Sequence, residues 1–385
     1  MASANGIDFV HTGPGSVAGR YLRRFWQPVY RAEDLAHGKM VPIQIMSERF
    51  TLFRGEGGTA HLVDFRCAHR GTQLSTGWVE GDSVRCRYHG WRYEGSGQCV
   101  EQPGEEEAFA QKIKIRSYPA QEYLGLIFAY LGEGKPPPLR RYAALEGDGV
   151  LEVYTPEYWP CNYFNRIDNA CDVGHVRFAH RESREAVGQA LETPVLSAEE
   201  TGYGVRTSVV QGGKLVATLH FHMPNTNHFR TYLAIRDPAS GFSSDYLDRL
   251  LIRVPVDDEH CVSFPLDFAH LSGEAARKYQ ERRQRARQAT KDSHTDLGEE
   301  ILAGKLRMCE VTEQANLKNL TSLEDYIVQV GQGGIPDRDE ERLGRMDVGV
   351  ILLRKLWERE LEALVEGKPL KEWKVPENLG DTGQV

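Results

Sequence analysis

Two short segments, each with one cysteine and one histidine, constrain the fold more than any other feature of the sequence. Cys67-Ala-His69 is followed by Cys86-Arg-Tyr-His89, which gives the spacings C-x-H and C-x-x-H. Two thiolates and two imidazoles can hold one metal centre only if the fold brings both loops together. Zinc loops usually pair cysteine with cysteine and histidine with histidine. The mixed loops therefore favour a [2Fe–2S] cluster with two cysteines on one iron and two histidines on the other. A zinc-stabilised binding module is the alternative.

Composition and charge exclude several classes of protein. The chain has 385 residues, of which 40% are hydrophobic, and its formal net charge is −8. At this length and apolar content we expect two domains, each with its own core. The longest apolar stretches, 124–131 and 348–353, are far shorter than the ~20 residues that cross a bilayer. Because no secretory signal is visible and the charge is acidic, we expect a cytoplasmic protein with neither a membrane nor nucleic acid as partner.

The pattern along the chain predicts an α+β protein made of two different domains. From 41 to 130, short alternating apolar runs broken by glycine are typical of a small, mostly antiparallel β domain. Pro136–Pro138 interrupts regular structure, so we expect the domains to be 1–145 and 146–385. In the second domain, strand-like alternation between 203 and 266 predicts an antiparallel sheet. The flanking helices are expected over 163–180, 273–302 and 339–366.

A second group of candidate functional residues lies in the predicted helix 163–180. Asn169, Asp172 and His175 have the spacing i, i+3, i+6 and would share one helical face. His180 lies about 140° around the helix from His175, so both imidazoles meet one metal only if a π-bulge widens the helix or the helix ends between them. Two histidines and one carboxylate form the facial triad of non-haem Fe(II) enzymes, which leaves positions open for O₂ and substrate. Paired histidines alone are usually ordinary core or surface residues, but a metal motif elsewhere in the chain favours iron.

Both motifs together resemble one protein family. C-x-H-R-G and C-x-x-H-G-W, as they stand at 67–71 and 86–91, resemble the Rieske motif. N-x-x-D-x-x-H-x4-H at 169–180 resembles the oxygenase component of Rieske non-haem iron oxygenases, in the phthalate-dioxygenase-like group. The resemblance covers nearly the whole chain. It implies a small all-β Rieske domain followed by a helix-grip-like catalytic domain, and within the group the chain is similar to aryl-ether O-demethylases.

The resemblance also implies which residues hold each cofactor. It places a cluster ligand at each of the four motif positions, namely Cys67 and Cys86 on the inner iron and His69 and His89 on the outer iron. For the mononuclear Fe(II) it implies His175, His180 and a carboxylate further along the chain. Together with O₂ as co-substrate, these are the expected cofactors.

Several downstream carboxylates compete for the third position on the mononuclear iron. They are Asp292, Asp296, Glu310, Glu313, Glu324 and Asp325. In the family the ligand is an aspartate shortly before a G-x-I-x-D-R-like block, which here reads Gly-Ile-Pro-Asp-Arg at 334–338. The resemblance therefore favours Asp325. Asp296, close to His294, is the second choice.

The resemblance gives Asp172 a different role from that of a ligand. It implies that Asp172 bridges a cluster histidine of one subunit and His175 or His180 of the next, so that the electron crosses a subunit interface. A homotrimer is the expected assembly. Asn169, one helical turn earlier, is expected beside the open face of the iron.

The sequence contains no plant-type ferredoxin motif, Walker loop or dinucleotide-binding motif, so a separate flavin and iron–sulfur reductase, possibly with a ferredoxin, is expected to deliver electrons from NAD(P)H. The expected reaction is O-demethylation or hydroxylation of a lignin-derived or carboxylated aromatic compound, with cis-dihydroxylation of a ring as the alternative. A Rieske electron carrier without oxygenase activity is the alternative of another class.

Five arginines lie in or beside the two cluster loops, namely Arg66, Arg70, Arg85, Arg87 and Arg92. We expect them either to steer an acidic electron donor towards the cluster or to form ion pairs with local carboxylates.

Overall fold

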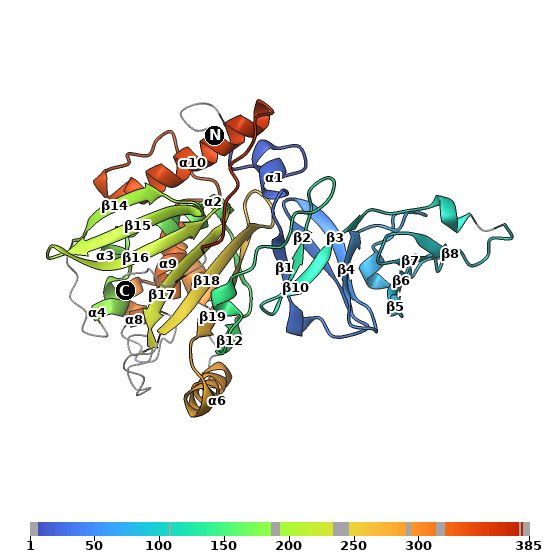
Figure 1. Cartoon of the computed structure of the whole chain (residues 1–385), viewed down its shortest axis with the longest axis horizontal. Coiled ribbons are helices and arrows are strands. Elements are labelled where there is room, and N and C mark those ends of the chain that lie inside the picture. Colours follow the sequence, from blue (N-terminus) through green and yellow to red (C-terminus); the bar gives the residue numbers. More distant parts are fainter. Residues whose placement is uncertain are drawn as a thin grey trace. The chain divides into compact units, whose positions relative to one another are not determined.

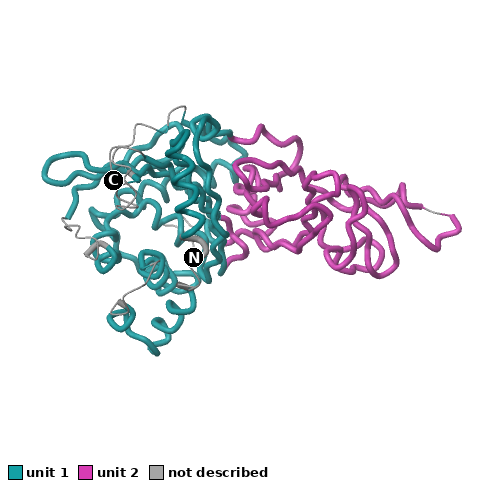
Figure 2. The backbone as a smooth tube through the Cα atoms, turned by 90° about the horizontal axis from the view of Figure 1, so that it is seen from below, with its two compact units in different colours: residues 1–10, 141–253, 259–385 teal, residues 11–140, 254–258 magenta. Residues whose placement is uncertain are grey.

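The computed structural model describes residues 7–107, 109–185, 193–233, 246–289, 294–312, 320–376 and 379 (Figure 1). The chain divides into two compact units (Figure 2). Unit 2 comprises His11–Arg140 and Val254–Asp258, and unit 1 comprises Met1–Val10, Arg141–Arg253 and Glu259–Val385. The domain division 1–145 and 146–385 stays a prediction beside this grouping.

Unit 2 is built from small antiparallel sheets. One has the order β1-β11-β10, with β1 at Gln27–Arg31, β10 at Ala120–Tyr123 and β11 at Leu126–Ala129. The next has the order β2-β3-β4-β9, with strands at Met40–Ile45, Glu48–Arg54, Ala60–Asp64 and Ser117–Tyr118. The third has the order β5-β6-β7-β8, with strands at Trp78–Glu80, Ser83–Arg85, Arg92–Glu94 and Cys99–Glu101. Helix α1 and the 3₁₀ helices η1, η2 and η3 span Val17–Leu22, Ala32–Asp34, Leu74–Thr76 and Ala110–Lys112. The predicted antiparallel β organisation of this part of the chain is confirmed.

Unit 1 contains one large antiparallel sheet. Its order is β12-β19-β18-β17-β16-β15-β14, and β13 also pairs with β19. The strands span Val150–Val153 (β12), Glu157–Trp159 (β13), Val195–Glu200 (β14), Gly204–Gln211 (β15), Lys214–His222 (β16), Thr226–Tyr232 (β17), Tyr246–Pro255 (β18) and Cys261–Ala269 (β19). The helices span Tyr163–Cys171 (α2), Val176–Ala179 (α3), Arg181–Glu185 (α4), Gly273–Ala289 (α6), His294–Leu302 (α7), Met308–Thr312 (α8), Leu320–Val330 (α9) and Val348–Val365 (α10), with 3₁₀ turns at Ala143–Leu145 (η4) and Arg345–Asp347 (η6).

Helices α2 and α10 cover one face of this sheet. Helix α10 packs against β14 and β15, and α2 packs against β16 and β17 and against α10 (Figure 1). Buried aromatic rings join the two helices, with the centroids of Phe164 and Trp357 5.4 Å apart. The helices approach closely at Gly349, where a Cβ would lie 2.3 Å from the Cys171 carbonyl oxygen, so only glycine fits. The predicted α+β architecture, with helices on an antiparallel sheet, is confirmed.

The expected helix over 163–180 is wrong as one element. Helix α2 ends at Cys171, and Asp172 is extended, with φ −88° and ψ 100°. The Asp172 carboxylate accepts a hydrogen bond from the His175 backbone N–H at 3.2 Å, which competes with the next helical hydrogen bond. The short α3 then runs from 176 to 179 and ends between His175 and His180, so the second of the two expected geometries is the one found.

Two other expected helices differ from the structure at their ends. The helix expected from 339 begins at Val348, because Gly344 is extended and its N–H donates to the Asp347 carboxylate at 2.6 Å. The stretch 273–302 holds α6 and α7, and residues 290–293 between them lie outside the described residues. None of the helices within the described ranges is long and apolar enough to span a membrane.

Candidate functional site

The predicted cluster ligands lie on two matching turns of unit 2. In the first turn the Gly71 N–H donates to the Cys67 carbonyl at 3.0 Å, and in the second the Gly90 N–H donates to the Cys86 carbonyl at 3.0 Å. Both glycines have a φ of 74°, in the left-handed region that only glycine adopts without strain. The matching shape of the two turns explains why Cys67 and Cys86 are each followed by a glycine four residues later.

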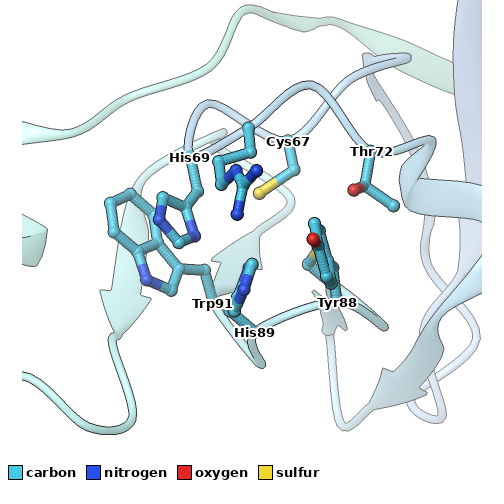
Figure 3. A pocket seen from close by; sticks show the side chains of 8 residues that line it. Cys67, His69, Thr72, Tyr88, His89 and Trp91 are labelled. Atoms are coloured by element: carbon cyan, nitrogen blue, oxygen red, sulfur yellow. The ribbon is translucent and has the colours of Figure 1, made fainter.

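The two turns bring the four side chains around one pocket (Figure 3). Its lining consists of Cys67, His69, Arg70, Thr72, Cys86, Tyr88, His89 and Trp91. Both cysteines are buried, and the rings of His69 and His89 lie with centroids 4.5 Å apart. The Nδ1 atoms of the two histidines are enclosed and have no hydrogen-bond partner. Two thiols and two unpartnered imidazole nitrogens around one pocket form a donor set that fits a [2Fe–2S] cluster.

Neighbouring side chains hold this pocket in place. Trp91 stacks on His69, with ring centroids 4.6 Å apart and planes 7° from parallel. The Tyr93 hydroxyl lies 3.2 Å from the Cys67 sulfur, within hydrogen-bonding distance. Because burial comes first among the causes that raise the pKa of Tyr93, its hydroxyl keeps its proton and remains a donor to that sulfur. Nothing in the sequence pattern indicated this contact.

The arginines around the cluster turns fall into two groups. Arg85 pairs with Glu80 and Glu101 at 2.7 and 2.9 Å, and Arg92 pairs with Glu101 at 2.9 Å. The exposed group of Arg66, Arg70 and Arg87 makes no ion pair within the described part of the chain. Arg66 donates to a backbone carbonyl, and Arg70 and Arg87 lie over the exposed rings of Tyr88 and Trp78. The pairing with local carboxylates is therefore confirmed for Arg85 and Arg92, and the steering of an acidic donor by the exposed group stays a prediction.

In unit 1, three of the predicted iron-site residues lie together. His175, His180 and Asp325 each offer one ligand atom, and these atoms lie within 4.8 Å of one another. Asp325 Oδ1 lies 3.8 Å from Nε2 of His175 and 3.6 Å from Nε2 of His180. Among the described residues this is the one group of at least three side chains whose ligand atoms all lie this close together, and neither Asp296 nor Glu310 belongs to it. Asp292 and Glu313 lie outside the described residues.

Each of the two histidines has a carboxylate neighbour beside its Nδ1 atom. The Asp172 carboxylate lies 3.6 Å from Nδ1 of His175. His180 Nδ1 lies 3.1 Å from Glu324, whose carboxylate also accepts hydrogen bonds from Ser183. These contacts leave the Nε2 atoms of both histidines facing Asp325, the arrangement that a shared metal ion needs.

Amide side chains complete the surroundings of Asp325. Gln329 donates to Asp325 Oδ1 at 2.9 Å, and Asn169 Nδ2 lies 3.5 Å from the same oxygen and 3.4 Å from Nε2 of His175. Asn169 thus lies beside the three grouped side chains. Neither Gln329 nor the role of Glu324 was predicted from the sequence. The i, i+4 spacing of Asp325 and Gln329 was a usable signal, whereas the contact of Glu324 with His180 depends on tertiary structure.

Comparisons with known proteins show what this chain is similar to. Residues 25–119 match the Rieske [2Fe-2S] domain family. The chain is 27% identical over 383 residues to the 5,5'-dehydrodivanillate O-demethylase oxygenase subunit of Sphingobium sp. SYK-6, covering 96% of this chain and 83% of that protein. It is 26% identical over 378 residues to the phthalate 4,5-dioxygenase oxygenase subunit of Pseudomonas putida, covering 91% of this chain and 84% of that protein.

Other relatives act on different compounds. The tert-butanol monooxygenase / tert-amyl alcohol desaturase oxygenase subunit of Aquincola tertiaricarbonis is 27% identical over 374 residues, covering 91% of this chain and 75% of that protein. Among solved structures, NdmA of Pseudomonas putida CBB5 has a TM-score of 0.65 at 20% identity, covering 91% of this chain and 94% of that chain. The terminal oxygenase of carbazole 1,9a-dioxygenase from Novosphingobium sp. KA1 has a TM-score of 0.63 at 20% identity, covering 86% and 91%. The structural likeness is one of fold.

Proposed function

We propose that this chain, which belongs to the Rieske non-haem iron oxygenases, is a terminal oxygenase that oxidises an aromatic compound with O₂ and electrons from a separate NAD(P)H-dependent reductase. The observation that carries the proposal is the group of His175, His180 and Asp325 in unit 1. A Rieske electron carrier would need only the pocket of unit 2, so this group favours an oxygenase.

The [2Fe–2S] cluster is assigned to the pocket of unit 2. Cys67 and Cys86 would hold one iron, and His69 and His89 the other, which supplies a centre for transfer of single electrons. The enclosed Nδ1 atoms without hydrogen-bond partners support the histidine assignment, because a buried imidazole nitrogen rarely stays unpaired unless it binds something. Structural zinc fits the mixed loops less well.

His175, His180 and Asp325 would hold the mononuclear Fe(II), which supplies O₂ activation next to the substrate. The protein's own part is orientation. Glu324 would accept a hydrogen bond from Nδ1 of His180, which leaves the lone pair on Nε2 for the metal, and Gln329 donates to the Asp325 oxygen that lies nearest both histidines.

Asp172 and Asn169 have supporting roles in this proposal. The Asp172 carboxylate accepts a hydrogen bond from the His175 backbone N–H and lies 3.6 Å from the ring Nδ1, which has no hydrogen-bond partner, and its side chain is 27% exposed. It is therefore open to a second histidine, and we assign it the bridge to a cluster histidine of a neighbouring subunit in a homotrimer. Asn169 offers an amide at the edge of the group, where it can donate to a bound molecule.

The exposed arginines of unit 2 give the electron donor a place to dock. Arg66, Arg70 and Arg87 carry positive charge beside the cluster pocket, within a chain of net charge −8. An acidic donor would be steered towards them. Structures of the carbazole 1,9a-dioxygenase oxygenase in complex with a ferredoxin support a donor of that kind.

The substrate is proposed to be a lignin-derived or carboxylated aromatic compound that undergoes O-demethylation or hydroxylation. The likeness to the dehydrodivanillate O-demethylase subunit supports demethylation, and the likeness to the phthalate 4,5-dioxygenase subunit supports cis-dihydroxylation as the alternative. The same three iron ligands serve both reactions, because the outcome depends on which substrate carbon lies nearest the iron.

One experiment separates these possibilities. The protein is purified anaerobically, its iron, acid-labile sulfide and visible spectrum are recorded, and O₂ uptake is measured with a reductase over a panel of methoxylated and carboxylated aromatics. Formaldehyde release identifies demethylation, and a diol without formaldehyde identifies dihydroxylation. Colourless protein with zinc and no sulfide contradicts the proposal, and so does substrate-dependent O₂ uptake that is unchanged in His175→Ala.

A further inference from the structure

A buried arginine without a counter-ion lies on the sheet of unit 1. Arg253, on β18, is 2% exposed. Its Nε and Nη1 atoms are enclosed and have no hydrogen-bond partner, and its guanidinium makes no ion pair with any carboxylate of the described residues. Its backbone is fixed on both sides, because its N–H donates to the Asn225 carbonyl at 3.1 Å and its carbonyl accepts from the Asn225 side chain at 2.8 Å.

The rest of the sheet shows how unusual this is. Arg249, four residues earlier on the same strand, donates to both oxygens of Asp267 at 2.6 and 2.8 Å. Arg230 on β17 does the same with Asp248, at 3.0 and 2.9 Å. Burying a charge without a partner is costly, so native proteins pair such groups. The buried positive charge of Arg253 therefore lacks the anionic partner that would offset the cost of its burial.

Strand register places Arg253 on the helix-covered face of the sheet. The Thr207 side chain points to that face, since its Oγ1 would lie 2.9 Å from a Cβ at Gly349 of α10. Cross-strand partners share a face, as do residues two apart on one strand. Side chains on that face can be followed from strand to strand through three cross-strand pairs, Thr207↔Leu219, Phe221↔Asn227 and Asn227↔Leu251. Arg253 lies two residues after Leu251 on the same strand and therefore points to the same face.

The charged groups that act on the Arg253 guanidinium include the proposed iron ligand Asp325. Burial lowers the pKa of Arg253 to about 9, the nearby Arg166 guanidinium lowers it as well, and the Asp325 carboxylate raises it. Arg166, on α2, donates to Gln329 at 2.8 Å, and Gln329 in turn donates to Asp325. Asp325 is committed to the metal in our proposal, and Arg166 is itself a cation, so neither supplies the missing anion.

A second unpartnered polar group lies on the same face. Asn227, on β17, is 5% exposed, and its side-chain oxygen is enclosed without a hydrogen-bond partner. Since Asn227 pairs with Leu251, two residues before Arg253, the two side chains are diagonal neighbours across adjacent strands. The unpartnered Asn227 atom is an acceptor, so it suits a donor group on a ligand, whereas the unpartnered N–H groups of the Arg253 guanidinium suit a carboxylate.

We propose that Arg253 binds the carboxylate of an acidic aromatic substrate through its unpartnered N–H groups and thereby orients the ring towards the proposed iron site. A carboxylate matches the planar fork of a guanidinium and accepts two parallel hydrogen bonds. This inference rests on the proposed function, adds a recognition residue to it, and narrows its substrate to a carboxylated aromatic compound.

The binding test uses a matched pair of probes on the metal-loaded protein under anaerobic conditions, 4-methoxybenzoate and its neutral analogue 4-methoxybenzamide, with calorimetry as the readout. Wild type is expected to bind the benzoate at least about tenfold more tightly, the usual scale of a charge-assisted hydrogen bond. Arg253→Met abolishes this preference, and Arg253→Lys keeps part of it. Arg249→Met, on the same strand and face, is the matched control and keeps the full preference.

Thermal unfolding without ligand separates recognition from a purely structural role. Arg253→Met has the same Tm as wild type or a higher one, because an unpaired buried charge is removed, whereas Arg249→Met has a lower Tm because Asp267 loses its partner. The benzoate raises the Tm of wild type and leaves that of Arg253→Met unchanged.

Three results overturn the inference. The first is that wild type binds the benzoate no better than the benzamide. The second is that Arg253→Met still prefers the benzoate. The third is that Arg253→Met lowers the Tm as much as Arg249→Met does. Iron and sulfide content are recorded on every sample and do not depend on Arg253. A protein that holds both metal centres but shows no anion preference therefore contradicts this inference alone.

Discussion

His180 Nδ1 lies 3.1 Å from Oε2 of Glu324, a carboxylate that is 1% exposed. Its neighbour in sequence, Asp325, lies 3.6 Å from the other nitrogen of the same ring. Consecutive residues of α9 thus contact opposite sides of one imidazole, which fixes both its tautomer and its direction. The orientation of His180 is therefore built into the helix that carries the proposed third ligand.

Removing the Glu324 carboxylate should weaken metal binding without removing a ligand. Glu324→Ala is expected to weaken divalent-metal affinity about 10- to 100-fold, because His180 is no longer held in one tautomer. Glu324→Gln, which retains an oxygen that accepts from Nδ1, restores part of the affinity. Competition with a chelator, with Co²⁺ as the probe, measures the Kd. Glu310→Ala, at an exposed acid that also competed for the ligand position, is the control with wild-type affinity. Equal affinities for Glu324→Ala and wild type would refute the positioning role.

The assignments of the third iron ligand to Asp325 and to Asp296 predict opposite effects of substitution on the iron content. Asp325→Ala should lose the mononuclear iron and keep the sulfide and the colour of the cluster, because the two sites share no ligand in our assignment. Asp296→Ala should keep both. Iron and acid-labile sulfide analysis after anaerobic reconstitution gives the ratio directly. Loss of iron from Asp296→Ala, with retention in Asp325→Ala, would reverse the assignment.

The Tyr93 hydroxyl should tune the cluster potential. It lies 3.2 Å from the Cys67 sulfur and, as a donor, stabilises the more negative, reduced cluster. Tyr93→Phe is expected to lower the reduction potential by about 50 mV, the one-electron equivalent of one modest hydrogen bond. A redox titration followed by visible or electron paramagnetic resonance spectroscopy measures this. Tyr88→Phe, at an exposed ring of the same pocket, should leave the potential unchanged. An unaltered or raised potential in Tyr93→Phe would contradict the assignment.

The exposed arginines of unit 2 should act on the electron donor and leave the substrate step unchanged. Arg70→Glu and Arg87→Glu are expected to raise the KM for an acidic reductase or ferredoxin several-fold with little change in kcat at saturating donor. The effect should shrink as ionic strength rises, since both arginines are exposed and screened by salt. Steady-state kinetics over a salt series test this, with Arg277→Glu on α6 as the charge-matched control. A change in kcat alone, independent of salt, would argue against a docking role.

Local chemistry made part of this protein predictable from its sequence. The cluster turns were recognisable because cysteine, histidine and glycine recur at short, fixed spacings, and the antiparallel strands because their side chains alternate. The end of helix α2 before Asp172 was not predicted, because a hydrogen bond from the His175 N–H to the Asp172 side chain outweighs helical propensity there. The start of α10 was misplaced for a similar local reason at Gly344.

Long-range relationships were beyond sequence reasoning. Glu324 competed as a ligand in the sequence, yet in the structure its carboxylate points at Nδ1 of His180, and only the packing of α9 against α3 and α4 decides this. Arg253 gave no signal at all. An arginine in a strand is ordinary, and its significance comes from lacking a partner after burial, a property of the whole fold.

The most direct test of the central claim is anomalous diffraction at the iron edge from crystals grown without oxygen. We expect a pair of iron atoms between the turns of Cys67 and Cys86, and a single iron atom within bonding distance of His175, His180 and Asp325. Density for the pair alone, or a single iron held by other residues, would contradict the account.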